Sequence, residues 1–248
     1  MLITTLVFFF AFGLLLLLGR QVHRAMHGLA LLLTNNYQSA AFLYALPLLP
    51  GVALHEISHA VMALILRVRV RSFTLVPQRK AGSITLGSVE VNRADIVRMT
   101  FIGLAPMLVG IVVLTMIGWY VFDIGRLTKT IVSGDFRQIS NQVMLATQVG
   151  DAYLWFYLMF VVANAMLPSR SDTVTLPPVL LFLTCIFATI VFVVGFDWLR
   201  YVKTGVVSTM QWLSAVFILT SFINLLVLIP LWFLVQIFQK LTGRQIVY

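Results

Sequence analysis

The sequence predicts an all-α polytopic membrane protein with about six transmembrane helices and one small membrane-associated β-hairpin. Of its 248 residues, 60% are hydrophobic and only 10% are charged, and the mean hydropathy is +1.00. A soluble domain carries about 25% charged residues, so this composition cannot cover a globular surface with polar groups. Backbone in the hydrocarbon must satisfy its own hydrogen bonds, which favours helices.

Six apolar segments approach or reach the length of about 17–25 residues that a spanning helix needs. They are 3–19, 40–66, 100–122, 152–167, 176–196 and 211–238. Pro230 interrupts the last of them late, and Pro47, Pro50 and Gly51 kink or loosen the second. We expect one membrane domain over 1–248, with an N-terminal helix and interfacial segment (1–39), a core (40–175) and C-terminal helices (176–248).

The segment 20–36 follows the first apolar run but contains several basic and polar residues. Arg20, His23, Arg24 and His27 fall three or four residues apart, which is typical of a helix lying at the membrane surface. His23 and His27 have no neighbouring Glu, so we favour this interpretation over a second metal site. The pair Asn35-Asn36 is expected to end the helix.

The segment 68–91 contains the one strong strand signal. Two runs of alternating apolar and polar residues flank a turn-forming stretch at 77–82, which predicts a β-hairpin. The alternation slips near Ser72 and again at Gly87-Ser88, and such slips predict bulges.

The charge of +9 fits a membrane protein better than a nucleic-acid binder, because the basic residues flank apolar runs and form no stripe interleaved with aromatic residues. If all six helices cross, ten of the 17 Lys and Arg residues lie on the side of the hairpin. Positive charge favours the cytoplasmic side. We therefore expect a hairpin and active site nearer the cytoplasm. No cleavable signal peptide is evident, and a prokaryotic plasma membrane is the expected location.

Residues 55–59 read His-Glu-Ile-Ser-His. On a helix, His55 and His59 project from one face and can bind one zinc ion, while Glu56 can take a proton from a zinc-bound water. Glu56 is the only acidic residue well inside an apolar span, and ionisable groups there are costly and usually functional. The alternative is a structural role, in which these polar groups form hydrogen bonds between helices.

Zinc needs a third protein ligand, which the acidic residues can supply. Asp123, Asp135, Asp151 and Asp197 are expected on the membrane face away from the hairpin. Asp172 follows the fourth apolar segment on the hairpin side and is our choice. Glu90 and Asp95, in or just beyond the hairpin, remain as alternatives.

The order of these features resembles the site-2 protease family of intramembrane zinc metalloproteases. The family's second motif is Asn-x-x-Pro followed by Leu-Asp-Gly, and its Asp is the third zinc ligand. The matching stretch here runs from Asn164 through Pro168 to Asp172. It departs from the family by having Ser171 and Thr173 beside the Asp, and by placing Pro168 one position further on.

A third family feature, an Ala-Gly-Pro segment with an Asn nearby, is approximated by Gly103-Leu104-Ala105-Pro106, with Val109 at the position where the Asn is expected. The resemblance spans about residues 45–175. It implies a Zn²⁺ cofactor and hydrolysis of transmembrane protein substrates within the bilayer. It also implies a hairpin edge that accepts the substrate as an added strand, although its arginines equally fit anchoring to lipid head groups.

The resemblance suggests that Asn164 binds the substrate backbone, but an interhelical hydrogen bond explains this residue equally well. Two other functions stay open: a non-catalytic relative that acts as a membrane scaffold, and a metal-binding membrane transporter. The sequence predicts no nucleic-acid partner and does not indicate an oligomeric state.

Overall fold

The protein is mostly helical, with two short antiparallel strand pairs. The structure is a computed structural model that describes residues 2–80, 83–123, 147–167, 169–194 and 199–244, together with isolated positions between 124 and 146. The helices are α1 (Leu2–Thr34), α2 (Tyr37–Ala45), the 3-10 turn η1 (Leu46–Leu48), α3 (Leu49–Ile65), α4 (Ile96–Tyr120), α7 (Ala152–Ala165), α8 (Arg170–Thr173), α9 (Leu176–Val194) and α10 (Leu199–Thr242).

Four helical stretches of the described chain are long and apolar enough to cross a membrane, as expected for an integral membrane protein. They are Leu2–Thr34, Tyr37–Ile65, Ile96–Tyr120 and Lys203–Thr242. Two further apolar stretches, Ala152–Ala165 and Ser171–Ile186, are shorter. The expected polytopic helical architecture is therefore present, and among the described residues four of the six expected crossings are long and apolar enough to span.

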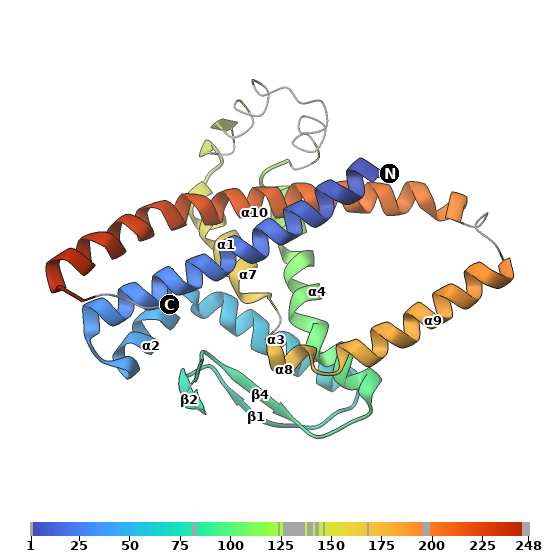
Figure 1. Cartoon of the computed structure of the whole chain (residues 1–248), viewed down its shortest axis with the longest axis horizontal. Helices are drawn as coiled ribbons and strands as arrows, with labels where there is room; N and C mark the ends of the chain where they lie inside the picture. The colour runs from blue at the N-terminus through green and yellow to red at the C-terminus, as the bar shows by residue number, and fades with distance from the viewer. Residues whose placement is uncertain are drawn as a thin grey trace.

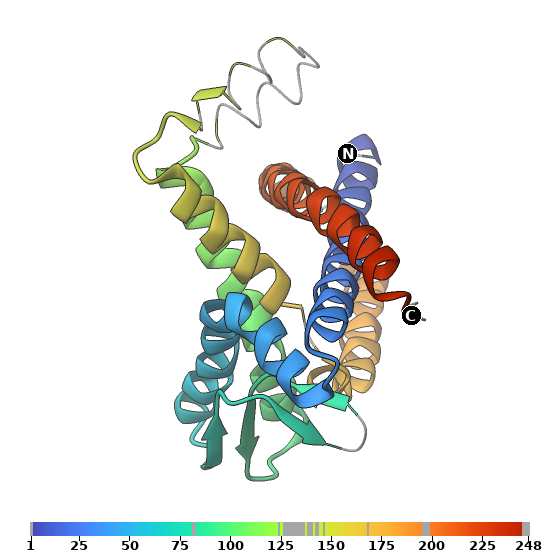
Figure 2. The same ribbon diagram turned by 90° about the vertical axis from the view of Figure 1, so that its left-hand side faces the viewer.

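The helices form two layers, which Figure 2 shows edge-on. One layer contains α3, α4 and α7, which pack against one another, and the other contains the long helices α1 and α10, which lie side by side (Figure 1). The buried core lies between them, with Leu15 of α1, Leu114 of α4, Val161 of α7 and Phe217 of α10 among its members. α9 runs from α8 towards the start of α10 at the right of Figure 1.

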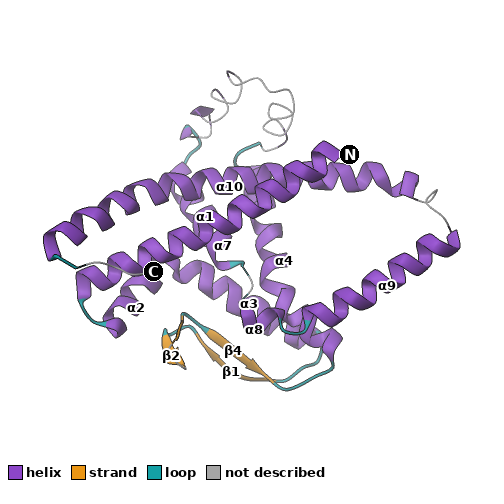
Figure 3. Ribbon diagram, in the orientation of Figure 1, coloured by secondary structure: helices purple, strands orange, loops and turns teal. Residues whose placement is uncertain are grey.

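The predicted hairpin is confirmed and lies below α3 in Figure 3. Its strands are β1 (Val70–Thr74), β2 (Gln78–Lys80), β3 (Ser83–Thr85) and β4 (Ser88–Val91). β1 pairs with β4 and β2 with β3, both antiparallel, and the register shifts between Val70 and Ser72, where a bulge was predicted. The second predicted slip corresponds to the break between β3 and β4.

The prediction of a separate surface helix over 20–36 is wrong. α1 continues without interruption from Leu2 to Thr34, because no Pro or unfavourable dihedral occurs before Asn35, which has a φ of 50°. The expected stop at Asn35-Asn36 is confirmed, and the Asn36 side chain caps α2. His23 is turned towards the protein rather than the head groups, where it contacts Tyr44 and Asn164.

The prediction that Pro230 interrupts the last helix is wrong. α10 has 44 residues and includes Pro230. In lipid, one missing hydrogen bond is outweighed by the remaining intrahelical bonds, which have no water to compete with them. Most of the polar connection 123–149 lies outside the described residues, as do Asp135, Pro168 and Asp197.

Candidate metal centre

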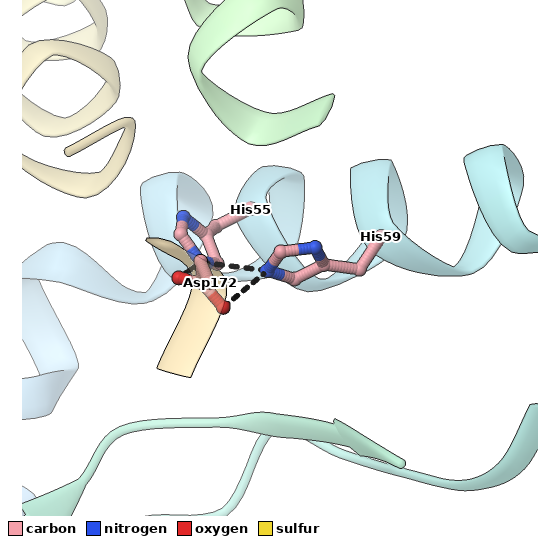
Figure 4. Close-up of side chains that lie close together, drawn as sticks. All are labelled: His55, His59 and Asp172. Atoms are coloured by element: carbon pink, nitrogen blue, oxygen red, sulfur yellow. Dashed lines mark hydrogen bonds and ion pairs between the residues drawn. The ribbon is translucent and has the colours of Figure 1, made fainter. Parts of the chain in front are cut away.

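The two histidines of the His-Glu-Ile-Ser-His motif lie on α3, as predicted, at the face that meets α4 and α7. They are four positions apart in the helix, so their rings project side by side (Figure 4). His59 is only 8% exposed, and Glu56 between them is 7% exposed. Burying such groups costs free energy unless they have partners, so their contacts decide what this helix can do.

Hydrogen bonds to the neighbouring helices fix the tautomer of both rings. The Nδ1 atom of His55 lies 2.6 Å from the carbonyl oxygen of Ala165, and that of His59 lies 2.7 Å from the carbonyl oxygen of Ile102. A carbonyl oxygen only accepts, so each Nδ1 carries the proton and donates it. In the neutral imidazole, Nε2 then presents a lone pair, which is the arrangement that metal-binding histidines use.

The two Nε2 atoms converge on the carboxylate of Asp172. They lie 3.1 Å from each other, His59 Nε2 lies 3.5 Å from Asp172 Oδ1, and His55 Nε2 lies 3.8 Å from Asp172 Oδ2. Two ligands on a tetrahedral zinc ion are about 3.3 Å apart, given metal–ligand bonds of about 2.0–2.1 Å. The group His55, His59 and Asp172 can therefore hold a metal ion.

Asp172 is oriented by a capping box at the start of α8. Ser169 Oγ accepts a hydrogen bond from the backbone N–H of Asp172 at 3.4 Å, and the Ser169 N–H donates to Asp172 Oδ2 at 2.7 Å. This reciprocal pair leaves Oδ1 directed at His59 and limits rotation of the carboxylate. The Ser-x-x-Asp spacing is visible in the sequence as a capping signature, but our sequence analysis overlooked it.

α4 forms the other support of the metal-binding group. A Cβ atom on Gly103 would lie 2.1 Å from the carbonyl oxygen of Asp172, so only glycine permits this close approach. One residue earlier, Ile102 accepts the hydrogen bond from His59. Thr100 donates to the carbonyl oxygen of Thr175 at 3.1 Å and so ties α4 to the segment after α8. The Gly103–Pro106 segment therefore matters chiefly through Gly103.

The metal-binding group and Glu56 line one cavity of about 710 Å³. α1 contributes Phe12 and Arg20 to its wall, and the hairpin contributes Gly87, just before β4, and Val89 of β4. The Glu56 carboxylate accepts a hydrogen bond from the backbone N–H of Val89. A buried carboxylate in the same cavity as three convergent ligands is placed to exchange protons with a molecule bound there.

Asn164 lines this cavity from α7 and is 3% exposed. Its Nδ2 donates to Phe160 O at 2.8 Å and to Asn224 Oδ1 of α10 at 2.7 Å, so the interhelical hydrogen bond that we considered is present. Its Oδ1 has no partner among the described residues. This buried oxygen therefore has an unused capacity to accept a hydrogen bond.

His23 and His27 do not form a metal site with any described acidic residue. His23 Nδ1 lies 2.5 Å from the hydroxyl of Tyr44, and His23 Nε2 lies 3.1 Å from the carbonyl oxygen of Asn164. His27 packs edge-on against the same tyrosine ring. The pair joins α1 to α2 and α7, a role that we missed because the nearby arginines favoured a surface helix.

The alternative third ligands lie away from the histidines. Asp95 is exposed and caps α4, where its Oδ1 accepts from the Arg98 N–H at 3.0 Å. Glu90 is exposed on β4 and does not belong to the metal-binding group. The structure brings Asp172, rather than either of these residues, to His55 and His59.

No protein-family model, curated protein or solved structure matches the chain. The interpretation of the site therefore depends on its own geometry.

Replacing Asp172 by Asn should remove the metal from the purified protein. The amide preserves the shape of the side chain but is a much weaker ligand than a carboxylate. Asp95→Asn is the matched control, since Asn caps a helix as well as Asp does. We expect about one metal ion per chain by mass spectrometry for the wild type and for Asp95→Asn, and little for Asp172→Asn. Equal metal content in all three would exclude Asp172 as a ligand.

Replacing Gly103 by Ala should weaken metal binding even though Gly103 touches no metal. The added methyl group would displace the backbone of Asp172, and disturbing the support of a ligand costs about 10- to 100-fold in affinity. Gly13→Ala is the control, because a Cβ there meets nothing within 4 Å. Competition titration with a chelating dye measures both affinities, and a wild-type value for Gly103→Ala would contradict this packing argument.

Proposed function

We propose that the protein is an intramembrane zinc metalloendopeptidase that hydrolyses peptide bonds of transmembrane proteins, similar to the site-2 protease family. The observation that carries the proposal is the convergence of two tautomer-fixed histidines on Asp172 beside the buried carboxylate of Glu56. A purely structural polar cluster would satisfy its groups mutually. With both rings neutral, two lone pairs face each other at 3.1 Å, which is favourable when a cation lies between them.

Zinc fits this set of donors best among the common ions. Two imidazoles and one carboxylate are the ligands of many catalytic zinc sites, in which the fourth position stays open. When bound, zinc supplies Lewis acidity, which polarises a substrate carbonyl and lowers the pKa of water to about 7. The open position would face the cavity shared with Glu56.

Glu56 acts as the general base and then as the general acid. It takes a proton from the attacking water and delivers it to the amine that leaves when the peptide bond breaks. Its burial keeps it out of bulk solvent, so the proton stays near the reacting atoms. A metal store or a scaffold needs no such carboxylate beside its ligands.

The substrate would enter the cavity in an extended conformation. Among the described strands β4 pairs only with β1, so the part of its other edge that Glu56 does not occupy can accept an added strand from an unwound transmembrane segment. Asn164 Oδ1 is available to accept from the substrate backbone. We place the site nearer the cytoplasmic side of a prokaryotic plasma membrane, because basic residues are concentrated on the side of the hairpin.

Replacing Glu56 by Gln separates this function from its alternatives. The amide cannot exchange the proton, so we expect cleavage to fall by about 10²- to 10⁴-fold while zinc content stays at one ion per chain. The assay reconstitutes the protein with a panel of single-span transmembrane peptides and follows the products by mass spectrometry. A metal transporter would tolerate the change and still move ions, and a scaffold would cleave nothing in either form. Either result would overturn the proposal.

A further inference from the structure

The break between β3 and β4 brings the hairpin backbone against Glu56. A Cβ atom on Gly87 would lie 2.8 Å from Glu56 Cγ and 3.1 Å from Glu56 Oε1, and also 3.1 Å from Val52 Cγ1. Glu56 Cγ lies near the root of its side chain and cannot move without a change of rotamer. The hairpin and the glutamate therefore fit together only while residue 87 has no side chain.

The next contact fixes the carboxylate itself. The backbone N–H of Val89 donates to Glu56. Val89 is paired with Phe73 of β1, and an N–H that reaches α3 points away from that pairing. The donor therefore belongs to the open edge of β4. Hydrogen bonds to a carboxylate are among the stronger ones in proteins, so this bond restrains where the oxygen atoms lie.

We propose that the hairpin is a positioning element for the general base: Gly87 admits Glu56 to the edge of β4, and the Val89 N–H holds its carboxylate towards the metal-binding group. This inference rests on the proposed function of Glu56. It gives the hairpin a task separate from substrate binding and from anchoring to head groups. Neither substrate binding nor anchoring requires glycine at position 87, whereas the close approach of Glu56 to the hairpin does.

The first test replaces Gly87 by Ala, with Gly205→Ala as the matched control because a Cβ at Gly205 meets nothing within 4 Å. We expect kcat for transmembrane peptide cleavage to fall by about 100-fold, the cost of a misplaced catalytic group. KM and zinc content should stay at wild-type values, because the atoms nearest to a Cβ on Gly87 belong to Glu56 and Val52 rather than to His55, His59 or Asp172. Loss of zinc, a rise in KM alone or an unchanged kcat would each overturn the proposal.

A second test needs no cleavage and covers the case in which Gly87→Ala does not fold. Hydrogen exchange of the Val89 amide should accelerate in Glu56→Ala, because its acceptor is removed, while the Asn92 amide, which donates to the carbonyl oxygen of Arg69 at 2.9 Å, should keep its rate. Unchanged exchange at Val89 would overturn the positioning role. If exchange responds but the wild type cleaves no peptide, the contact stands and the proposed function fails, so the two failures are distinguishable.

Discussion

Two hydrogen bonds from histidine Nδ1 atoms to backbone carbonyls are the interaction on which the rest of the site depends. One joins α3 to α7 through His55 and Ala165, and the other joins α3 to α4 through His59 and Ile102. In the apolar interior a ring nitrogen without a partner is costly, so these bonds both align the helices and orient the rings. The same contacts thus hold the layer together and present both Nε2 atoms to the cavity.

Such short bonds require the helices to approach closely, and glycines make that possible. A Cβ on Gly51 would lie 2.2 Å from the carbonyl oxygen of Val161, so α3 and α7 meet backbone to backbone one turn before His55. Gly103 likewise allows the backbone of α4 to approach the backbone of Asp172 closely. In lipid, where helix association depends on packing rather than on the hydrophobic effect, small residues at crossings are the usual means of close contact.

The sequence predicted the features that depend on local pattern. The apolar runs gave the helical membrane class, the alternation at 68–91 gave the hairpin with its bulge, and the spacing of His55 and His59 placed both rings on one face. Asp172 was chosen from the order of the helices and does lie beside them. The contacts of Gly87 and Gly103 could not be predicted, because a glycine gives no local sign of what approaches it. The continuity of α1 and α10 was missed because polar residues and a proline suggest breaks, whereas no helix-breaking dihedral occurs in α1 before Asn35 and α10 continues through Pro230.

We propose that His55, His59 and Asp172 bind one zinc ion with an open position. Zinc K-edge X-ray absorption of the detergent-purified protein tests it most directly. The account predicts four light ligands at about 2.0–2.1 Å, with the multiple-scattering signature of two imidazoles and no sulfur. Six oxygen ligands, a sulfur shell, or a spectrum that still shows two imidazoles after His59→Ala would contradict it.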